Sequence, residues 1–342
     1  METLGVGLIG AGRIGRLHAE NLVRHIQGAE LLWVADVVEG AAAKLSRELG
    51  IPKATADYRE VLSDPEVDAV LICTSTDTHA EIIRAAAAAG KHIFCEKPLA
   101  LDLAEIDSVL AAVKEAGVIL QVGFHRRFDP NFRRLKELIV EGSIGRPWLL
   151  KITSYDPAPP PIAYIRASGG IFLDMTIHDF DMARFLLGEV EEVHAAGSVL
   201  VDPEIRAAGD VDTAVVTLKF ESGALGVITN CRKASYGHDQ RIEVLGEKGG
   251  LFAENPLPHT AVLADQEGYR SAPLHHFFVE RYREAYVAEM EAFVAAVRNK
   301  TAPPVTGLDG KIPVVMGYAA KRSLEEGRPV RLSEIDPALD AG

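Results

Sequence analysis

The sequence predicts an α/β chain with two domains. A doubly wound parallel sheet at the amino end is followed by an α+β domain with a large, open, mostly antiparallel sheet. Three observations carry this prediction. Residues 4–123 alternate between apolar runs and helical periodicity, as parallel sheets do. Beyond residue 190, several β-type runs follow one another. The length of 342 residues suits about two domains, which we place at residues 1–123 and 124–335.

A glycine-rich turn, G-A-G-R-I-G, ends the first apolar run, and a helical pattern follows at once. In such a unit Gly10 allows a tight turn, Gly12 lets the backbone approach a pyrophosphate, and Gly15 lets the helix pack on the strand. The first residues of the helix, Arg13 and Ile14, then bring backbone N–H groups to the phosphates. The pattern predicts a Rossmann domain that binds a dinucleotide.

The next strand ends in an acidic residue, Asp36, twenty-one positions after Gly15. A carboxylate there accepts hydrogen bonds from the adenosine ribose hydroxyls and repels a 2′-phosphate. Val37, which we include among the cofactor contacts, and Val38 come next, so no arginine follows to bind that phosphate. We therefore expect NAD rather than NADP. A glycine turn without a ligand is the alternative, which the strand, helix and Asp36 together disfavour.

Other strand ends of this domain also carry polar residues. Ligands of doubly wound sheets bind outside the carboxyl ends of the strands, so we expect Thr74, Glu96 and Lys97 to contact the cofactor. Thr74 opens a polar loop over residues 74–79. Lys97 should face the nicotinamide, and Pro98 restricts it to extended conformations. The alternative for Lys97 is a solvated surface lysine.

In the second domain, Asp174 and His178 lie four positions apart in one long helix that we expect after Gly170. That spacing puts both side chains on one face. Oxidation of a secondary alcohol needs a base for the hydroxyl proton, and a histidine with a pKa near the working pH suits this role. A carboxylate on the same face orients the imidazole. From the residues, a structural histidine behind an acidic first turn explains the pattern equally well.

Two further polar segments are candidates for substrate contacts. Arg127 follows the sixth strand, where its N–H groups could bind a polyol, although adjacent arginines are usually solvated or ion-paired. Tyr236 opens the segment Y-G-H-D-Q-R, for which an ordinary hairpin turn is the alternative. The remaining histidines, including the pair His275-His276, lack metal-ligand spacing, so we predict no metal site.

Composition excludes several classes of function. The net charge of −13 argues against a nucleic-acid partner, and no apolar run is long enough to span a membrane. The chain starts with a strand instead of a basic and apolar leader. Three distant cysteines fit neither a disulfide framework nor a zinc site and favour a reducing cytoplasm. An open sheet with an uncovered face often becomes an interface, so we expect a homo-oligomer.

As a set, these residues resemble the glucose–fructose oxidoreductase and inositol dehydrogenase family along essentially the whole chain. The shared marks are the glycine turn, the sequence Glu96-Lys97-Pro98, and Asp174 with His178-Asp179. The segments around Arg127, Asp174 and Tyr236 are similar to the substrate-site segments of bacterial inositol dehydrogenases. His125 stands where many of these enzymes have Met or another apolar residue.

The resemblance implies an NAD-dependent oxidation of myo-inositol to 2-keto-myo-inositol. It implies Lys97, Asp174 and His178 as the catalytic set, with His178 as the general base. It also favours Arg127 and Tyr236 as substrate contacts, and a tetramer built through the sheet of the second domain. Three alternatives remain: another cyclitol such as scyllo-inositol, or an aldose, as substrate; a glycosidase with tightly bound NAD; and a non-catalytic NAD sensor on the same fold.

Overall fold

The computed structural model describes residues 3–340, whose contacts divide the chain into two compact units. The first unit contains the residues up to Phe128 together with Glu284–Ile312, and the second contains Asp129–Arg283 and the residues from Pro313 on. From the sequence we expect residues 284–312 in the second domain, whereas the structure has them in the first unit. Across residues 3–340, no helix is both long and apolar enough to cross a membrane.

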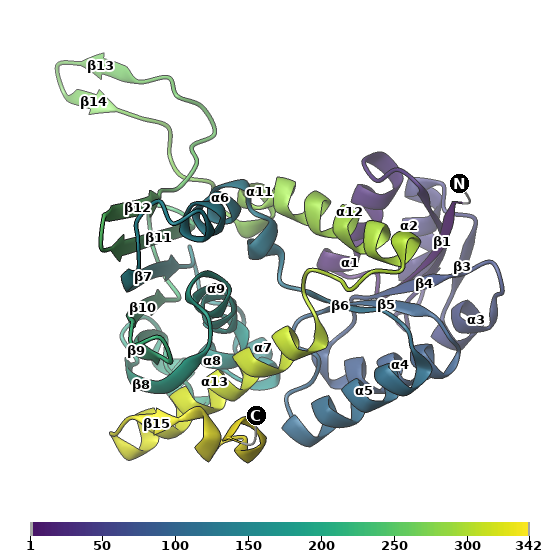
Figure 1. Ribbon diagram of the computed structural model, residues 1–342. Coiled ribbons are helices and arrows are strands. Elements are labelled where there is room, and N and C mark those ends of the chain that lie inside the picture. Colours follow the sequence, from purple (N-terminus) through teal and green to yellow (C-terminus); the bar gives the residue numbers. More distant parts are fainter. Residues whose placement is uncertain (1–2, 341–342) are drawn as a thin grey trace. The chain divides into compact units, whose positions relative to one another are not determined.

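The first unit is a six-stranded parallel sheet with helices on both faces (Figure 1). The strand order is β3-β2-β1-β4-β5-β6, and every neighbouring pair is parallel, which confirms the predicted Rossmann sheet. Its elements are β1 (Leu4–Ile9), α1 (Arg13–Arg24), β2 (Ala29–Ala35), α2 (Ala41–Leu49), β3 (Lys53–Thr55), α3 (Tyr58–Ser63), β4 (Ala69–Ile72), α4 (Thr76–Ala88), β5 (His92–Glu96), α5 (Leu103–Ala116), β6 (Leu120–Gly123), a 3-10 turn (His125–Phe128) and α12 (Arg283–Asn299).

Helix α12 belongs to this unit because its apolar face completes the core. Strands β1 and β4 are buried along their whole length, as the central strands of a parallel sheet are. Met290 and Phe293 of α12 lie in one buried cluster with Val6, Leu8 and Leu71 of these strands. In Figure 1 the helix lies on the same face of the sheet as α1 and α2, while α4 and α5 cover the other face. The apolar spacing of α12 reveals a helix, but not which sheet the helix covers.

The second unit is built on a seven-stranded sheet of order β12-β11-β7-β10-β9-β8-β15. Strands β7 and β10 run parallel and all other neighbours antiparallel, so the predicted mostly antiparallel sheet is confirmed. Its elements are α6 (Pro130–Val140), β7 (Pro147–Tyr155), α7 (Ile162–Ser168), α8 (Ile171–Asp174), α9 (Ile177–Leu187), β8 (Val190–Ser198), α10 (Pro203–Ala207), β9 (Thr213–Phe220), β10 (Leu225–Cys231), β11 (Asp239–Gly246), β12 (Gly249–Ala253), β13 (Leu263–Asp265), β14 (Gly268–Arg270), α11 (Phe278–Arg281), β15 (Val330–Arg331) and two 3-10 turns (Leu332–Glu334 and Pro337–Asp340). Helix α13 (Gly307–Glu326) is shared, because its residues up to Ile312 belong to the first unit and the rest to the second.

One face of this sheet is packed and the other is open. Burial alternates along β9, as expected for a sheet with one covered face. On the open face, Leu225 and Leu245 lie in register on either side of Leu149, so three leucines form a row across neighbouring strands. They are 55%, 49% and 41% exposed, respectively. The small hairpin of β13 and β14 extends away from the sheet (Figure 1).

Candidate functional site

A cavity of about 450 Å³ opens at the carboxyl ends of β1, β2 and β4 in the first unit. Its walls include five residues that the sequence assigns to the cofactor: Gly10, Gly12, Asp36, Val37 and Thr74. These residues come from three different strand–helix connections. The topology brings them together because parallel strands end at the same edge of the sheet.

The three glycines of the turn occur there for different reasons. Gly10 has a φ of +100°, and a Cβ there would lie 2.6 Å from the backbone of Cys73. A Cβ on Gly15 would lie 1.8 Å from the carbonyl oxygen of Gly10, so both positions need glycine for the turn itself. Gly12 is different, because a Cβ there would meet no described atom within 4 Å. The space beside Gly12 is therefore open for a ligand.

The amino end of α1 fits a phosphate. Among the described residues, no side chain caps this helix at Gly12, and its first turn holds no acidic residue. The backbone N–H groups that begin with Arg13 and Ile14 have no intrahelical acceptor at this end of a helix. Together with the open space beside Gly12, this arrangement fits the pyrophosphate of a dinucleotide.

Asp36 is tied to the glycine turn by its own carboxylate. Its Oδ2 accepts the N–H of Ala11 at 2.6 Å, and its Oδ1 accepts the N–H of Val38 at 2.8 Å. The side chain stays half-buried on the cavity wall, and a carboxylate has about four acceptor sites, so lone pairs remain for ribose hydroxyls. The following Val37 is 86% exposed.

The wall around Thr74 contains residues that sequence reasoning missed. The expected loop over residues 74–79 is in fact mostly helical, because α4 begins at Thr76. Its first turn brings Thr78 against Thr74, with 2.7 Å between the two hydroxyl oxygens, and Tyr58 lines the same cavity. The Ser75-Thr76 sequence before an apolar run is a helix-start signal that could have revealed this turn.

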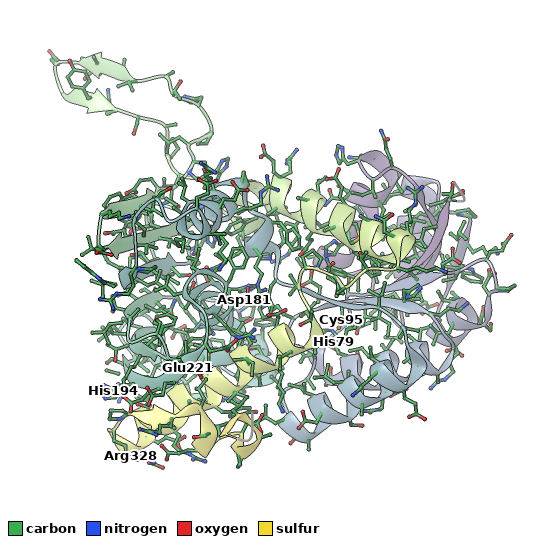
Figure 2. The ribbon with its side chains drawn as sticks, viewed as in Figure 1. His79, Cys95, Asp181, His194, Glu221 and Arg328 are labelled. Carbon is green, nitrogen blue, oxygen red and sulfur yellow. The ribbon has the colours of Figure 1, made fainter. Side chains whose placement is uncertain are left out.

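His79 of α4 links two of these strand ends (Figure 2). Its ring lies between two carbonyl oxygens, with Nδ1 2.8 Å from that of Pro98 and Nε2 3.1 Å from that of Thr74. The side chain is 1% exposed, and this burial lowers the pKa of His79 despite the two carbonyls. A neutral ring carries a single N–H, so we assign the hydrogen bond to the closer carbonyl, that of Pro98.

The lowered pKa of His79 predicts a pH dependence of stability. The unfolded chain binds a proton at this histidine below about pH 6.5, whereas the folded chain resists it, so stability falls as the solution is acidified. The variant His79→Gln keeps an amide donor but does not titrate. We expect the difference in unfolding free energy between wild type and variant, measured with urea, to shrink between about pH 7 and pH 5. A difference that stays constant with pH would contradict the assignment.

Glu96 and Lys97 stand at the end of β5, as expected. Glu96 contacts His18 of α1, with 2.7 Å between Oε1 and Nε2. Lys97 follows directly and is half-buried. Arg127, expected at the substrate, lies in the 3-10 turn after β6, and its Nη2 donates to Asp309 of the same unit at 3.0 Å. The carboxylate fixes the direction of this guanidinium, whose side chain is 10% exposed.

His125, where the family resemblance led us to expect an apolar residue, is 4% exposed in the structure. Its ring stacks on Tyr286 of α12, with 4.4 Å between ring centroids and 21° between ring planes. A buried aromatic contact of this kind lets histidine replace an apolar side chain at this position.

In the second unit, the long helix expected after Gly170 is divided into α8 and α9. Asp174 ends α8, and His178 lies in the first turn of α9. The N–H groups of Met175 and Thr176 both donate to the carbonyl of Ile171, so the turn between the helices widens. Asp174 and His178 are each half-buried, whereas the residues next to them in the chain are buried.

Asp174 is held by partners that the sequence pattern did not reveal. Tyr164 donates its hydroxyl to Oδ1 at 2.9 Å, and the guanidinium of Arg232 lies 3.3 Å from Oδ2. Arg232 is 1% exposed, and its Nη2 lies 3.7 Å from Asp210. Asp210 accepts the N–H of Ile171 at 2.9 Å, at the start of α8. Arg232 thus joins two carboxylates on either end of the short helix.

The start of α9 has an anchor of its own beneath His178. Thr176 donates its hydroxyl to Asn230 Oδ1 at 2.7 Å, and Asn230 donates its amide to Asp179 Oδ2, also at 2.7 Å. All three side chains are buried, and Asn230 belongs to β10. The hydrogen bonds therefore attach the first turn of α9 to the sheet and limit how His178 can move.

Tyr236 lies in the loop between β10 and β11 and is 54% exposed. Its hydroxyl donates to Asp239 Oδ2 at 2.8 Å. Partial burial and this hydrogen bond raise the pKa of Tyr236 to about 12. Burial raises the pKa of Asp239, but hydrogen bonds from Arg241, Asn255 and Tyr236 lower it more, so this pKa lies below its usual value. The phenol is therefore a neutral, oriented group at the surface.

Two family models match the chain. Residues 4–124 match an oxidoreductase family with an NAD-binding Rossmann fold, and residues 132–252 match the GFO/IDH/MocA C-terminal domain. The first match covers the parallel sheet and its cavity. The second covers most of the larger sheet and the helices that carry Asp174 and His178.

Similar proteins match over nearly the whole chain. The myo-inositol 2-dehydrogenase of Thermotoga maritima is 56% identical over 331 residues, which are 96% of this chain and 99% of the relative. The scyllo-inositol 2-dehydrogenase (NAD(+)) of Bacillus subtilis is 44% identical over 95% of each chain. The crystal structure of scyllo-inositol dehydrogenase from Lactobacillus casei, with bound NAD(H) and scyllo-inositol, is 31% identical with a TM-score of 0.90 over 97% of this chain and 100% of that one. The chain belongs to the GFO/IDH/MocA oxidoreductase family.

Proposed function

We propose that this protein is an NAD-dependent inositol 2-dehydrogenase that oxidises myo-inositol to 2-keto-myo-inositol. The observation that carries the proposal is the high identity to the Thermotoga relative along nearly the entire chain. The cavity supports it, because its glycine turn, open helix end and Asp36 suit NAD without a 2′-phosphate.

The proposed reaction needs a base for one hydroxyl proton and a partner for the oxygen that becomes a ketone. His178 takes the proton from the reacting hydroxyl through its imidazole nitrogen. Asp174 stabilises the imidazolium that results, and Arg232 and Tyr164 hold the direction of the Asp174 carboxylate. Lys97 donates to the reacting oxygen and stabilises the charge that develops on it. The cofactor would supply the hydride acceptor, so the alcohol would lose a hydride from the carbon that bears the reacting hydroxyl and a proton to His178, which together are two electrons and two protons.

Arg127 and Tyr236 are proposed to contact other hydroxyls of the ring. Both side chains already have a carboxylate partner, Asp309 for Arg127 and Asp239 for Tyr236. Asp309 fixes the direction of the other N–H donors of Arg127, and Asp239 takes the one hydroxyl proton of Tyr236, so the phenol oxygen can accept from a ring hydroxyl. A polyol would therefore meet groups that need little rearrangement.

The isomer of inositol is tested by a substrate panel. We would measure NADH formation with myo-inositol, scyllo-inositol, D-chiro-inositol and glucose, each with NAD and with NADP. Strong NAD-dependent turnover on myo-inositol and weak turnover on the others is the expected result. Because the Bacillus relative is named for scyllo-inositol, turnover on that isomer is the second candidate. No turnover on any of the four would contradict the dehydrogenase and favour the glycosidase or sensor alternatives.

The cofactor preference depends on Asp36. Replacing Asp36 by alanine removes the acceptor for the ribose hydroxyls and the charge that repels a 2′-phosphate, so NAD should bind more weakly and the preference over NADP should narrow. The ratio of kcat/KM for the two cofactors measures this change. Because the carboxylate also accepts the N–H groups of Ala11 and Val38, Asp36→Asn serves as a control that keeps one acceptor oxygen. An unchanged ratio in both variants would show that Asp36 does not contact the ribose.

We also propose that the protein is a cytoplasmic homotetramer that associates through the open face of the seven-stranded sheet. The row of Leu149, Leu225 and Leu245 supports this, because a contiguous apolar row is costly to leave in water. The cytoplasmic location rests on the unpaired cysteines Cys73, Cys95 and Cys231. Sedimentation equilibrium would test the assembly, and a monomer at all concentrations would contradict it.

A further inference from the structure

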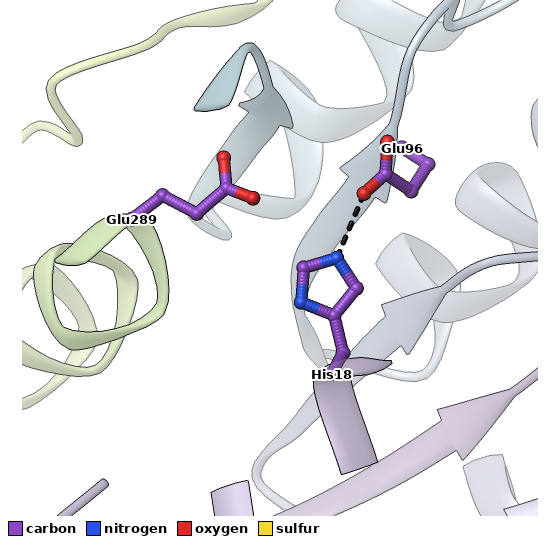
Figure 3. Close-up of side chains that lie close together, drawn as sticks. All are labelled: His18, Glu96 and Glu289. Atoms are coloured by element: carbon purple, nitrogen blue, oxygen red, sulfur yellow. Dashed lines mark hydrogen bonds and ion pairs between the residues drawn. The ribbon is translucent and has the colours of Figure 1, made fainter. Parts of the chain in front are cut away.

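Three side chains converge inside the first unit from elements far apart in sequence (Figure 3). His18 comes from α1, Glu96 from the end of β5, and Glu289 from α12. The side chains of His18 and Glu289 are fully buried, and that of Glu96 is 13% exposed. One nitrogen of the imidazole and one oxygen of each carboxylate all lie within 4.8 Å of one another.

The bonding within this group is incomplete. Nε2 of His18 and Oε1 of Glu96 are 2.7 Å apart, but in the described part of the chain neither oxygen of Glu289 has a hydrogen-bond partner. Aromatic rings surround the group, since Phe94 and Tyr286 pack edge-on against His18 and Phe293 packs against Phe94. A carboxylate buried without a partner is costly, so a positive charge or a proton must neutralise Glu289.

The spacing of the three groups distinguishes between these two possibilities. A protonated carboxyl would still donate a hydrogen bond, yet Glu289 forms none among the described residues although two acceptor-bearing groups are near. Two ligand atoms of one metal ion stand about 3 to 4 Å apart, and the three ligand atoms here, all within 4.8 Å of one another, are close enough to reach one ion.

We propose that His18, Glu96 and Glu289 form a binding site for one divalent transition-metal ion, such as zinc. Imidazole nitrogen and carboxylate oxygen are both common zinc ligands, and two carboxylates with a neutral histidine balance a charge of +2. The His18–Glu96 contact opens by about 0.5 Å to admit the ion, and water supplies a fourth ligand.

The position of the site indicates what the ion does. It ties the end of β5, which continues into Lys97, to the helix that starts at the glycine turn and to α12. The ion therefore stabilises the first unit, whatever reaction the protein performs. Spacing along the sequence does not reveal this site, because each ligand comes from a different element.

The test is calorimetric titration of zinc into the full-length chain, free of tags and NAD and pretreated with a chelator. We expect one saturable site per chain. Glu289→Gln keeps the shape of the side chain but removes one ligand, and should weaken binding by about 100-fold. The matched control is Glu291→Gln, which changes an exposed glutamate on the same helix and should leave binding unchanged.

A second variant and a second measurement keep the test decisive. His18→Gln should lose the site as Glu289→Gln does, so the result does not depend on one variant that folds poorly. Zinc should raise the melting temperature of the wild type and of Glu291→Gln, and should not raise that of the other two variants. Absence of a one-site isotherm, or equal zinc affinity in all four proteins, would overturn the proposal. It would mean that a proton or a water molecule, and not a metal ion, neutralises or hydrogen-bonds Glu289.

Discussion

Replacing His178 by alanine is expected to lower kcat by about 100-fold or more while NAD still binds with near-normal affinity. The variant loses the group that we propose takes the hydroxyl proton, whereas the cavity that fits the dinucleotide lies in the other unit and should stay intact. Lys97→Ala should show a loss of similar size, since it removes the proposed donor to the reacting oxygen. Turnover is measured by the absorbance of NADH, and NAD affinity by titration in the absence of substrate.

The control for His178 is another histidine of the second unit. His194 lies exposed on β8 (Figure 2), outside the group of proposed site residues, and His194→Ala should retain full turnover. Near-normal turnover in both His178→Ala and Lys97→Ala would remove the catalytic assignment. Loss of NAD affinity together with kcat would point instead to a general disturbance of the fold.

Replacing Arg232 by methionine is expected to lower both stability and turnover. The change leaves Asp174 and Asp210, with side chains 13% and 10% exposed, without their shared cation. Removal of one partner from a buried ion pair costs about 3 to 5 kcal/mol, and we expect the lower end because both carboxylates keep some contact with water. Turnover should fall because Asp174 loses one of the groups that direct its carboxylate. Urea unfolding and steady-state kinetics measure the two effects.

A surface arginine provides the comparison. Arg328 forms an exposed ion pair with Glu334 in the same unit (Figure 2), so Arg328→Met should leave both the unfolding midpoint and kcat close to those of the wild type. The hypothesis for Arg232 fails if the two variants lose stability equally, or if Arg232→Met keeps normal turnover despite its lower stability.

The sequence was most informative about the first unit, because its signals are local. A glycine turn, an acidic residue at the end of the next strand and buried apolar runs each depend on neighbours in the chain, and they predicted the parallel sheet and five residues of the cavity wall. The start of α4 at Thr76 is hidden in the sequence, because the polar residues from Thr74 to His79 resemble a loop. The side chain of His79 in fact contacts the carbonyl of Pro98, just beyond the end of another strand.

In the second unit, sequence-based prediction fails for a different reason. The spacing of Asp174 and His178 suggested one continuous helix, but Asp210 and Asn230 hold the two short helices at separate places. These partners lie tens of residues away, and Arg232 reaches Asp174 only once β10 has formed. Periodicity contains no information on such contacts. It also does not show that α12 packs on the first sheet.

The return of α12 to the amino-terminal sheet has a consequence for how the protein is made. Residues up to Phe128 leave the ribosome first, but the helix that covers Val6 and Leu8 emerges only after the whole segment 129–283 has been synthesised. During that interval an apolar face of the nascent sheet stays open to water and to other chains. We therefore expect the nascent chain to need a chaperone until Phe293 appears, and a fragment that stops at Phe128 to aggregate.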